Sequence, residues 1–248
     1  MSASQIALSL VVPAYNEVSR LPPSLQRIRR HLDSLDRPYQ VLVVDDGSTD
    51  GTGALVEAAA DSWPQLELVA FAHNQGKGAA VRAGMLRATG ELRLFSDADL
   101  STPIAEMAKL ELAIASGAGV AIGSRALPES QVELHQPIYR ELMGKMYNQA
   151  LRRLLLPGLR DTQCGFKMFT AAATHSCFAE LRTPGFGFDA EVLLRAQLKQ
   201  ITIAEVPVVW RNAAGTRVSS LRDGGEMLVD LFRLRRRVGA DPGSAQRS

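Results

Sequence analysis

The sequence predicts a single α/β domain with a mostly parallel central sheet and helices on both faces of that sheet. Short, continuous apolar runs of the kind that form buried parallel strands alternate with segments that carry apolar residues at helical spacing. A cluster of polar residues follows each of the first five apolar runs. The chain has 248 residues, 46% of them hydrophobic, so it can bury one large core. This alternation is typical of a doubly wound sheet that brings its polar clusters to one edge.

The first two apolar runs, at 8–12 and 41–44, are expected to be buried strands. We expect Pro13 to end the pairing of the first strand, because proline has no N–H to donate. Asp45 and Asp46 come directly off the second strand, so they are poorly explained as helix caps. A carboxylate at this position can accept a hydrogen bond from a nucleobase N–H or a ribose hydroxyl. Helices are expected after the two strands, over 22–35 and 52–60.

A third strand, expected over 66–72, leads to two glycines that flank Lys77 at the start of a helix. These glycines either let a ligand approach the backbone closely or serve a tight turn, and both interpretations remain open. The spacing does not match the Walker pattern of nucleotide-binding loops. The inner face of the helix is expected to hold Ala80, Val81, Gly84 and Leu86.

The fourth strand, expected over 91–96, ends in Asp97 and Asp99. Residues two apart on an extended backbone point to the same side, so the two carboxylates are expected to lie together. Open α/β sheets bind ligands at this end of their strands, and Mg²⁺ prefers carboxylates together with phosphate oxygens. The pair therefore predicts a metal site. The alternative is a solvated turn in which Thr102 caps the helix expected over 103–115.

The second half of the chain has a less regular pattern. A fifth strand over 120–122 leads to Arg125, and the stretch 127–136 is expected to be irregular. Acidic residues in the first turn of the helix expected over 185–199, Asp189 and Glu191, suit the helix dipole. The remaining expected elements are a helix over 138–156, a strand within 161–169, strands over 201–206 and 208–210 that close the sheet, and a helix over 227–238.

We expect residues 1–220 to form the domain and residues 221–239 to form an amphipathic, basic C-terminal helix. Arginines crowd the last turn of that helix, where they suit its dipole. The helix either packs on the domain or lies on an anionic membrane surface, where each arginine contributes about 1 kcal/mol. Residues 240–248 are expected to be a disordered tail.

The composition excludes several classes of protein. A net charge of +2, with no basic stripe interleaved with aromatic residues, argues against binding to nucleic acid. Two cysteines, Cys164 and Cys177, give no disulfide framework and fit a reducing compartment. No apolar run approaches the length of a membrane span, and the N-terminus lacks the pattern of a signal peptide. The expected location is therefore the cytoplasm, with peripheral attachment to the cytoplasmic face of the membrane as an open alternative.

Six motifs occur in one order along the chain and together carry a resemblance to a known family. The chain resembles the family 2 glycosyltransferases with the GT-A fold. Within them it is most similar to the polyprenyl-phosphate hexose synthases, and to the dolichyl-phosphate β-glucosyltransferases in particular. The motifs cover residues 12–17, 44–48, 74–78, 97–99, 123–125 and 161–167.

The resemblance implies a donor site for a nucleoside-diphosphate sugar. Asp99 matches the carboxylate that holds Mg²⁺ or Mn²⁺ on the diphosphate, and Asp97 lies beside it in the predicted metal pair. Ser101 stands where mannose synthases carry a further glutamine ligand, so the chain departs from their pattern there. The residues that match donor-site positions are Pro13, Ala14, Tyr15, Glu17, Asp46, Lys77, Asp97 and Asp99.

The resemblance also implies an acceptor site for a polyprenyl phosphate. Arg125, Arg140 and Arg217 match positions that face the acceptor phosphate. The reaction must bring two anions together, and this need for cations adds Lys167 to the candidates. Gly144 replaces a serine that some relatives carry near this grip.

The implied reaction is an inverting transfer of a hexose, with glucose and a uracil nucleotide favoured. A phosphate monoester is largely anionic at pH 7, so a phosphate acceptor needs little help from a general base. An acceptor hydroxyl would require a base, and the candidates are Asp161, Asp189 and Glu191. The alternatives are a glycosyltransferase with a soluble sugar or small-acid acceptor and a non-catalytic protein that binds nucleotide sugars. A nucleotidylyltransferase and a dinucleotide-binding oxidoreductase are disfavoured, because their glycine-rich loops are missing after the first strand.

Overall fold

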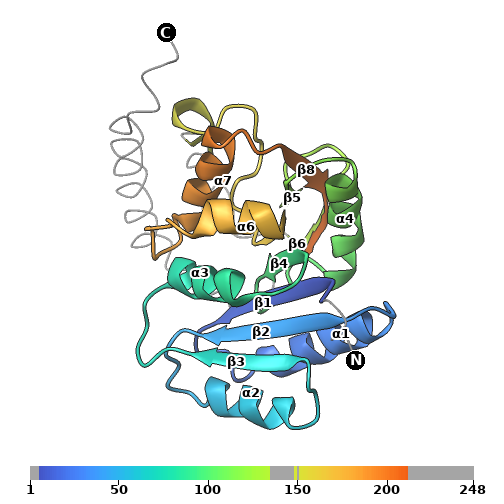
Figure 1. Cartoon of the computed structure of the whole chain (residues 1–248), viewed down its shortest axis with the longest axis vertical. Helices are drawn as coiled ribbons and strands as arrows, with labels where there is room; N and C mark the ends of the chain where they lie inside the picture. Colours follow the sequence, from blue (N-terminus) through green and yellow to red (C-terminus); the bar gives the residue numbers. More distant parts are fainter. Residues whose placement is uncertain (1–5, 135–147, 150, 212–248) are drawn as a thin grey trace.

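A computed structural model describes residues 6–134, 148, 149 and 151–211 of the chain. Over these residues the protein has the predicted α/β fold, with a mostly parallel sheet and helices on both faces (Figure 1). The expected helix over 138–156 lies largely outside them, although its end, at 151–154, is helical. The C-terminal helix and the tail also lie outside, so the predicted boundary at residue 220 remains a prediction.

The sheet has seven strands in the order β3-β2-β1-β4-β7-β5-β8, and β6 and β9 form a separate two-stranded sheet. The strands are β1 (Leu8–Ala14), β2 (Tyr39–Asp45), β3 (Leu66–Ala70), β4 (Leu92–Ser96), β5 (Val120–Ser124), β6 (Gln131–Leu134), β7 (Phe166–Thr170), β8 (Ile203–Pro207) and β9 (Val209–Arg211). The helices are α1 (Leu21–Asp33), α2 (Thr52–Ala60), α3 (Lys77–Arg87), the 3₁₀ turn η1 (Ile104–Glu106), α4 (Met107–Ala115), α6 (Ala171–Phe178) and α7 (Phe188–Leu198). None of the helices within the described residues is long and apolar enough to cross a membrane.

Strand direction determines where the functional loops meet. β1 runs parallel to both β2 and β4, and β2 runs parallel to β3. β7 is antiparallel to β4 and to β5, so β4 and β5 run in the same direction as each other. The carboxyl ends of β1, β2, β4 and β5 therefore lie at one edge of the sheet, where α/β proteins bind their ligands.

Two apolar cores cover the two faces of the sheet. α1, α2 and α4 pack on one face, and α3, α6 and α7 pack on the other (Figure 1). Gly84 lets α3 lie close to the sheet, because a Cβ at this position would collide with Val11 and Val44. On the same face an aromatic cluster joins β4, β7, α6 and α7. The ring of Phe169 lies 6.3 Å from that of Phe95 and 5.1 Å from that of Phe178.

Several details differ from the sequence-based expectations. Pro13 does not end the pairing of β1, which continues beside β2 as far as Ala14. Pairing with β4 stops at Val11, so the missing N–H of the proline falls near the end of the strand, where its loss is tolerated. In α3 the buried residue is Met85 rather than Leu86, which is only partly buried.

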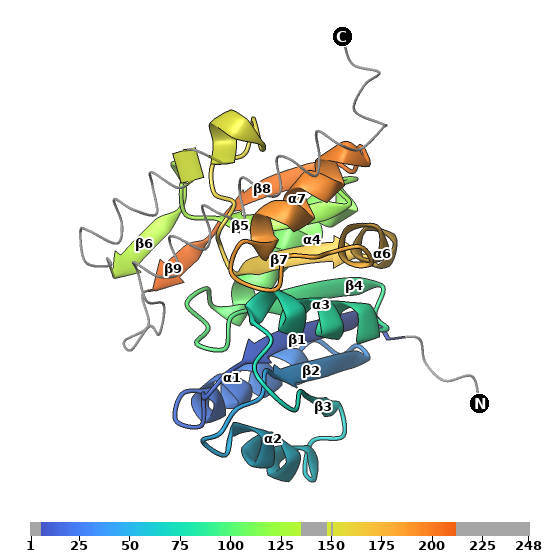
Figure 2. The same ribbon diagram turned by 90° about the vertical axis from the view of Figure 1, so that its left-hand side faces the viewer.

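The expected irregular stretch 127–136 contains a strand, β6, which was not predicted. Its partner is β9, so the expectation that 208–210 closes the main sheet was wrong, and β8 is its last strand. Figure 2 shows this small sheet projecting from the main one. The sequence analysis also missed α6, a short helix with a weak apolar pattern.

The aromatic cluster should dominate the stability of the α3–α6–α7 face. Phe169 is fully buried, so Phe169→Ala should lower the free energy of unfolding by about 3–5 kcal/mol, because it leaves a cavity between α6 and the sheet, beside Phe95 and Phe178. Chemical denaturation of the full chain measures this loss. The control is Leu112→Ala on α4, whose side chain is 69% exposed and should matter little. Equal effects of the two substitutions would contradict this packing.

Candidate functional site

Four of the motif loops follow strands that end at the same edge of the sheet. Asp46 follows β2, Asp97 and Asp99 follow β4, and Arg125 follows β5. The loop after β1 carries Tyr15, whose side chain is 42% exposed. The structure thus brings together polar clusters that lie far apart in the sequence, as the parallel sheet predicts.

The loop after β1 is tied to the loop after β2. The N–H of Asn16, a residue with a positive φ of 55°, donates to the hydroxyl of Ser48 at 2.8 Å. The N–H of Glu17 donates to the hydroxyl of Thr52 at 2.8 Å, and its carboxylate pairs with Arg20. Glu17 is therefore buried and already paired, while the aromatic ring of Tyr15 remains exposed.

Asp46 organises the loop that precedes α3. One carboxylate oxygen accepts the N–H of Gln75 at 2.7 Å, and the other accepts the N–H of Gly76 and the side chain of Asn74, both at 2.9 Å. Burial raises the pKa of Asp46, although the two backbone N–H groups oppose this rise. Counting partners among the described residues, Oδ2 of Asp46 accepts two N–H groups and Oδ1 accepts one, so only Oδ1 could readily accept a further hydrogen bond from a ligand. Asp46 therefore acts mainly by holding the loop before α3 in place.

The glycines around Lys77 make room for the protein's own backbone. Gly76 has a φ of +104°, and a Cβ on it would lie 2.5 Å from the carbonyl oxygen of Pro184. A Cβ on Gly78 would lie 2.5 Å from the carbonyl oxygen of Thr183. The segment before α7 thus packs directly against the start of α3. This close contact, rather than the approach of a ligand, explains why both positions lack side chains.

Lys77 and Asp97 form an ion pair at the edge, with 2.5 Å between Nζ and Oδ1. The ammonium also lies 5.9 Å from the centre of the Phe186 ring, a favourable cation–π distance. Burial would lower the pKa of Lys77, but Asp97, Asp189 and Asp99 together raise it, so the lysine stays charged. Gly165 packs against the carboxylate of Asp97, where any Cβ would collide.

Asp99 lies in a strained turn. Leu100 is buried and has a φ of +50°, a conformation that non-glycine residues rarely adopt. Oδ1 of Asp99 accepts the N–H of Ser101 at 2.9 Å, and the carbonyl oxygen of Ser101 accepts the N–H of Arg211 at 2.7 Å. Strain of this kind clusters at functional sites, because surrounding contacts must hold it in place.

The pair Asp97 and Asp99 offers hard oxygen ligands, which suit Mg²⁺ or Mn²⁺. Within the described ranges, no three His, Cys, Asp or Glu side chains lie close enough to hold a metal by themselves. Two carboxylates alone would leave a bound cation in need of further ligands from outside these residues. Lys77 already occupies one oxygen of Asp97, which leaves Asp99 as the better placed ligand.

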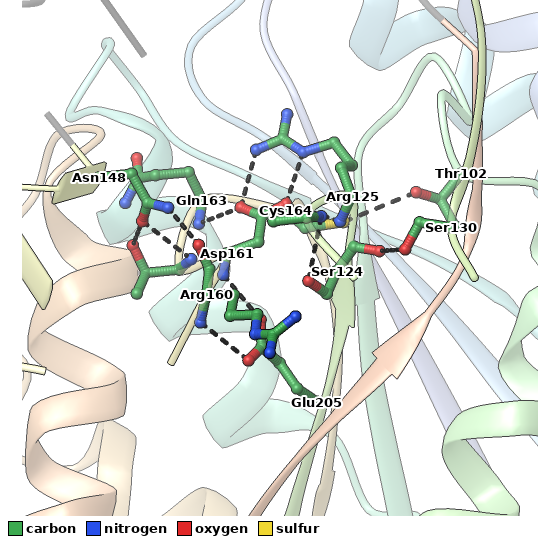
Figure 3. A network of polar contacts seen from close by, with 12 residues as sticks. Thr102, Ser124, Arg125, Ser130, Asn148, Arg160, Asp161, Gln163, Cys164 and Glu205 are labelled. Atoms are coloured by element: carbon green, nitrogen blue, oxygen red, sulfur yellow. Dashed lines mark hydrogen bonds and ion pairs between the residues drawn. The ribbon is translucent and has the colours of Figure 1, made fainter. Parts of the chain in front are cut away.

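Arg125 is held by Asp161 at the end of β5 (Figure 3). Its Nε and Nη2 donate to the two carboxylate oxygens at 2.7 and 2.9 Å, and its backbone N–H also donates to Oδ2 at 2.9 Å. The guanidinium lies 5.5 Å from the Trp210 ring. Burial would raise the pKa of Asp161, but Arg125 outweighs it and lowers that pKa to about 2. A carboxylate with so low a pKa is a poor general base, so the pair argues against that predicted role for Asp161.

The prediction that Lys167 contacts the acceptor phosphate was wrong. Lys167 lies on β7 in the middle of the sheet and exposes none of its side chain. It donates to the carbonyl oxygen of Cys164 at 2.6 Å and forms an ion pair with Asp189. Burial raises the pKa of Asp189, and Lys167 is the main group that opposes the rise.

Glu191, another candidate base, is occupied by structural contacts. Its carboxylate accepts the backbone N–H groups of Arg182 and Thr183 and the hydroxyl of Thr183, at 3.1, 2.9 and 2.6 Å. It also forms an ion pair with Arg195 at 2.8 Å. Burial would raise its pKa, but these contacts together lower it. Glu191 therefore anchors the segment before α7 and does not fit a proton-accepting role.

Comparison with known proteins decides the family. The model of the family described as glycosyl transferase family 2 matches residues 9–178, well over half of the chain. The chain belongs to this family.

This glycosyltransferase has relatives that match nearly its whole length. It is 36% identical over 243 residues to a dolichyl-phosphate β-glucosyltransferase of Trichomonas vaginalis. This match covers 94% of this chain and 72% of the relative. It is 34% identical over 248 residues to the human dolichyl-phosphate β-glucosyltransferase. That match covers 94% of this chain and 76% of the human protein. The protein is therefore an enzyme of the glycosyltransferase class, as the sequence motifs predicted.

Solved structures confirm the GT-A fold of the glycosyltransferase. A glucosyl-3-phosphoglycerate synthase of Mycobacterium tuberculosis, crystallised with Mn²⁺, UDP-glucose and phosphoglyceric acid, aligns with a TM-score of 0.71. The match covers 93% of this chain and 80% of that chain, at 19% sequence identity. At this identity the likeness speaks for the fold alone.

The sequence analysis missed two residues that support Arg125 in this glycosyltransferase. The carboxylate of Glu205 on β8 accepts the backbone N–H groups of Arg160 and Asp161 at 2.8 and 2.7 Å (Figure 3). Trp210 on β9 stacks on the guanidinium. A lone acid inside the apolar run 201–206 was a usable signal for Glu205. Arg140 and Arg217 lie outside the described residues, so their roles remain predictions.

The Arg125–Asp161 pair should make the free energy of unfolding of the glycosyltransferase depend on pH in the acid range. The pKa of Asp161 falls from its ordinary value of 3.8 to about 2 on folding. Its contribution is therefore present above about pH 4 and is lost as the pH falls towards 2, and it amounts to about 2 kcal/mol. Asp161→Asn should remove this pH-dependent part. The free energy of unfolding, measured against pH for both proteins, should show the wild-type advantage shrinking in acid. A constant difference across the range would refute the assignment.

Proposed function

We propose that this glycosyltransferase transfers glucose, with inversion, from UDP-glucose to dolichyl phosphate or another polyprenyl phosphate, and that it requires Mg²⁺ or Mn²⁺. The observation that carries the proposal is similarity over nearly the whole chain to enzymes named dolichyl-phosphate β-glucosyltransferases. The mycobacterial neighbour was crystallised with Mn²⁺ and UDP-glucose, and the proposal extends this donor and cofactor to the present chain. The charge distribution at the edge of the sheet fits this pair of substrates.

On the donor side, the acidic turn after β4 receives the diphosphate. Asp99, with Asp97 beside it, would hold a divalent cation, which would supply Lewis-acid stabilisation of the charge that the leaving diphosphate gains. Lys77 adds a fixed ammonium at the same place, because its ion pair with Asp97 holds it at the edge. The exposed ring of Tyr15, on the neighbouring loop, is positioned to pack against the nucleotide.

On the acceptor side, Arg125 provides the cation for the incoming phosphate. Two of its guanidinium nitrogens bind Asp161, and across the described part of the chain Nη1 has no hydrogen-bond partner. Asp161 and Trp210 thus fix the guanidinium and leave Nη1 for the acceptor. An arginine and a phosphate about 4 Å apart attract each other by roughly 4 kcal/mol at an effective dielectric of 20.

The acceptor phosphate itself is the nucleophile in this proposal. It is already largely anionic at pH 7, so no side chain has to remove a proton. The contacts of Asp161 and Glu191 agree with this, because both carboxylates are committed to cations and N–H groups. The task of the enzyme is then to align two anionic substrates for in-line attack at the anomeric carbon.

A transfer assay tests the proposed function. The full chain, labelled UDP-glucose, Mn²⁺ and a polyprenyl phosphate in detergent should give a labelled glycolipid, and EDTA should abolish its formation. GDP-mannose as donor and phosphoglyceric acid as acceptor serve as comparisons. The proposal fails if label passes to the soluble acid and not to the lipid, or if EDTA has no effect.

The proposed cation site requires the negative charge of Asp99. Asp99→Asn keeps an Oδ1 that can accept the Ser101 N–H but removes the charge, so it should lower turnover about 100-fold, as the loss of metal support commonly does. Asp36→Asn, an exposed acid on the α1–β2 connection, is the matched control. Wild-type turnover of the Asp99 variant at saturating Mn²⁺ would show that the metal lies elsewhere.

Arg125 should govern the use of the acceptor. Arg125→Lys keeps the charge but loses the forked contact with Asp161, so the KM for polyprenyl phosphate should rise about tenfold or more while the donor KM changes little. The control is Arg87→Lys at the far end of α3, where Arg87 pairs with Glu67 on the protein surface. An unchanged acceptor KM in the Arg125 variant would exclude this role.

A further inference from the structure

Lys167 and Asp189 form a buried ion pair that the proposed mechanism does not use. Lys167 exposes none of its side chain and Asp189 only 6%. The ammonium also donates to the carbonyl oxygen of Cys164 and lies 5.3 Å from the centre of the Phe95 ring. β7 and α7 are therefore joined by a charged contact in the middle of an apolar core.

Such a pair is a costly way to hold a core together. Removing two charges from water carries a large penalty, and well-packed apolar residues in the same place often give equal or greater stability. Phe95 and Phe188 already join β4 to α7, with their ring centres 5.7 Å apart. The core of this region thus has an apolar link of its own, and the charges need another explanation.

The pair lies close to the ion pair at the edge of the sheet. The Lys77 ammonium lies 5.9 Å from the centre of the ring of Phe186, three residues before Asp189, and a Cβ on Gly78 would lie 2.6 Å from the Cβ of Phe188. Lys77 itself contacts Asp97 at 2.5 Å. The two ion pairs, Lys167–Asp189 in the core and Lys77–Asp97 at the edge, therefore both lie near the start of α7.

Backbone contacts hold the start of α3 against the segment that leads into α7. The carbonyl oxygen of Pro184, just before α7, accepts the N–H of Ala79 in the first turn of α3 at 3.1 Å. Gly76 and Gly78 allow this close approach. Lys77, at the start of α3, thus lies against the segment that leads into Asp189, and a shift of α7 would move both residues together.

We propose that Lys167 and Asp189 are positioning residues of the donor site, in which Lys167 fixes the Asp189 carboxylate and Asp189 holds the Lys77 ammonium at the edge. Asp97 and Asp189 then attract Lys77 from two sides, so the lysine is in place before a diphosphate arrives. The inference rests on the proposed function only in that a sugar-nucleotide diphosphate binds beside Lys77.

The test replaces the buried pair with apolar residues of similar size, in the double variant Lys167→Met/Asp189→Leu. An apolar pair should keep the core packed, so thermal unfolding of the full chain should show a midpoint equal to or above that of the wild type. Titration calorimetry with Mn²⁺ present should show donor affinity about tenfold weaker. UDP-glucose and GDP-mannose are titrated in parallel, so that the donor is identified in the same experiment.

Asp189→Asn is the second variant, because it removes the charge and keeps the shape. It should fold and should also bind the donor about tenfold more weakly, a change that corresponds to ~1.4 kcal/mol. The matched control is Arg37→Met/Glu111→Leu, which removes a partly buried ion pair between the α1–β2 connection and α4. Donor affinity of the control should stay at the wild-type value.

The outcomes separate a positioning role from a purely structural one. If the apolar double variant or Asp189→Asn folds and binds the donor as tightly as the wild type, the pair serves the core alone and the inference is overturned. Failure of the wild type to transfer glucose to polyprenyl phosphate would instead overturn the proposed function. The calorimetric result on donor binding would still decide the role of Lys167 and Asp189.

Discussion

Carboxylates gathered at one edge of a sheet repel one another, and the need to balance them shapes this site more than any other constraint. The structure meets it with ion pairs that connect distant parts of the chain. Lys77 neutralises Asp97, which follows β4, and Asp161 neutralises Arg125, which follows β5. Each pair also anchors a loop, so the neutralisation of charge and the placement of functional groups are one interaction. Asp46 has no such cation in the part of the chain that the structure describes, and backbone N–H groups stabilise its carboxylate by donating hydrogen bonds to it.

Asp97 is linked by contacts to both halves of the proposed site. Its carboxylate pairs with Lys77 at 2.5 Å. Its N–H donates to the carbonyl oxygen of Gly165 at 3.1 Å, a few residues from Asp161, which holds Arg125. These contacts tie the loops that carry Lys77 and Arg125 to the turn after β4. In the proposed reaction, which joins two phosphate-bearing substrates, the cation proposed for each would then lie at the same edge before either binds. β9 reinforces it, with Trp210 against Arg125 and the N–H of Arg211 on the carbonyl oxygen of Ser101.

The sequence was sufficient to predict the sheet and its functional edge, because buried parallel strands leave continuous apolar runs and the polar clusters follow them directly. It was not sufficient to predict the partners. Lys167 was expected at the acceptor phosphate because it is a cation in a motif, yet its neighbours on both sides of β7 bury it completely. Glu205 and Trp210 act on residues some 45 to 85 positions away, a relation that no local pattern records. β6 and β9 have only four and three residues, too few to show a period.

The central claim is that the donor diphosphate and the acceptor phosphate meet at this edge, on either side of Asp97. Phosphorus NMR of a short-chain polyprenyl phosphate, with the full chain, UDP and Mn²⁺, tests it directly, because the relaxation that Mn²⁺ induces falls steeply with distance. The account predicts strong Mn²⁺-dependent relaxation of the acceptor phosphorus in the wild type and its loss in Arg125→Met. Relaxation that is absent in the wild type, while the acceptor is shown to bind, would place the two phosphates at separate sites and contradict the account.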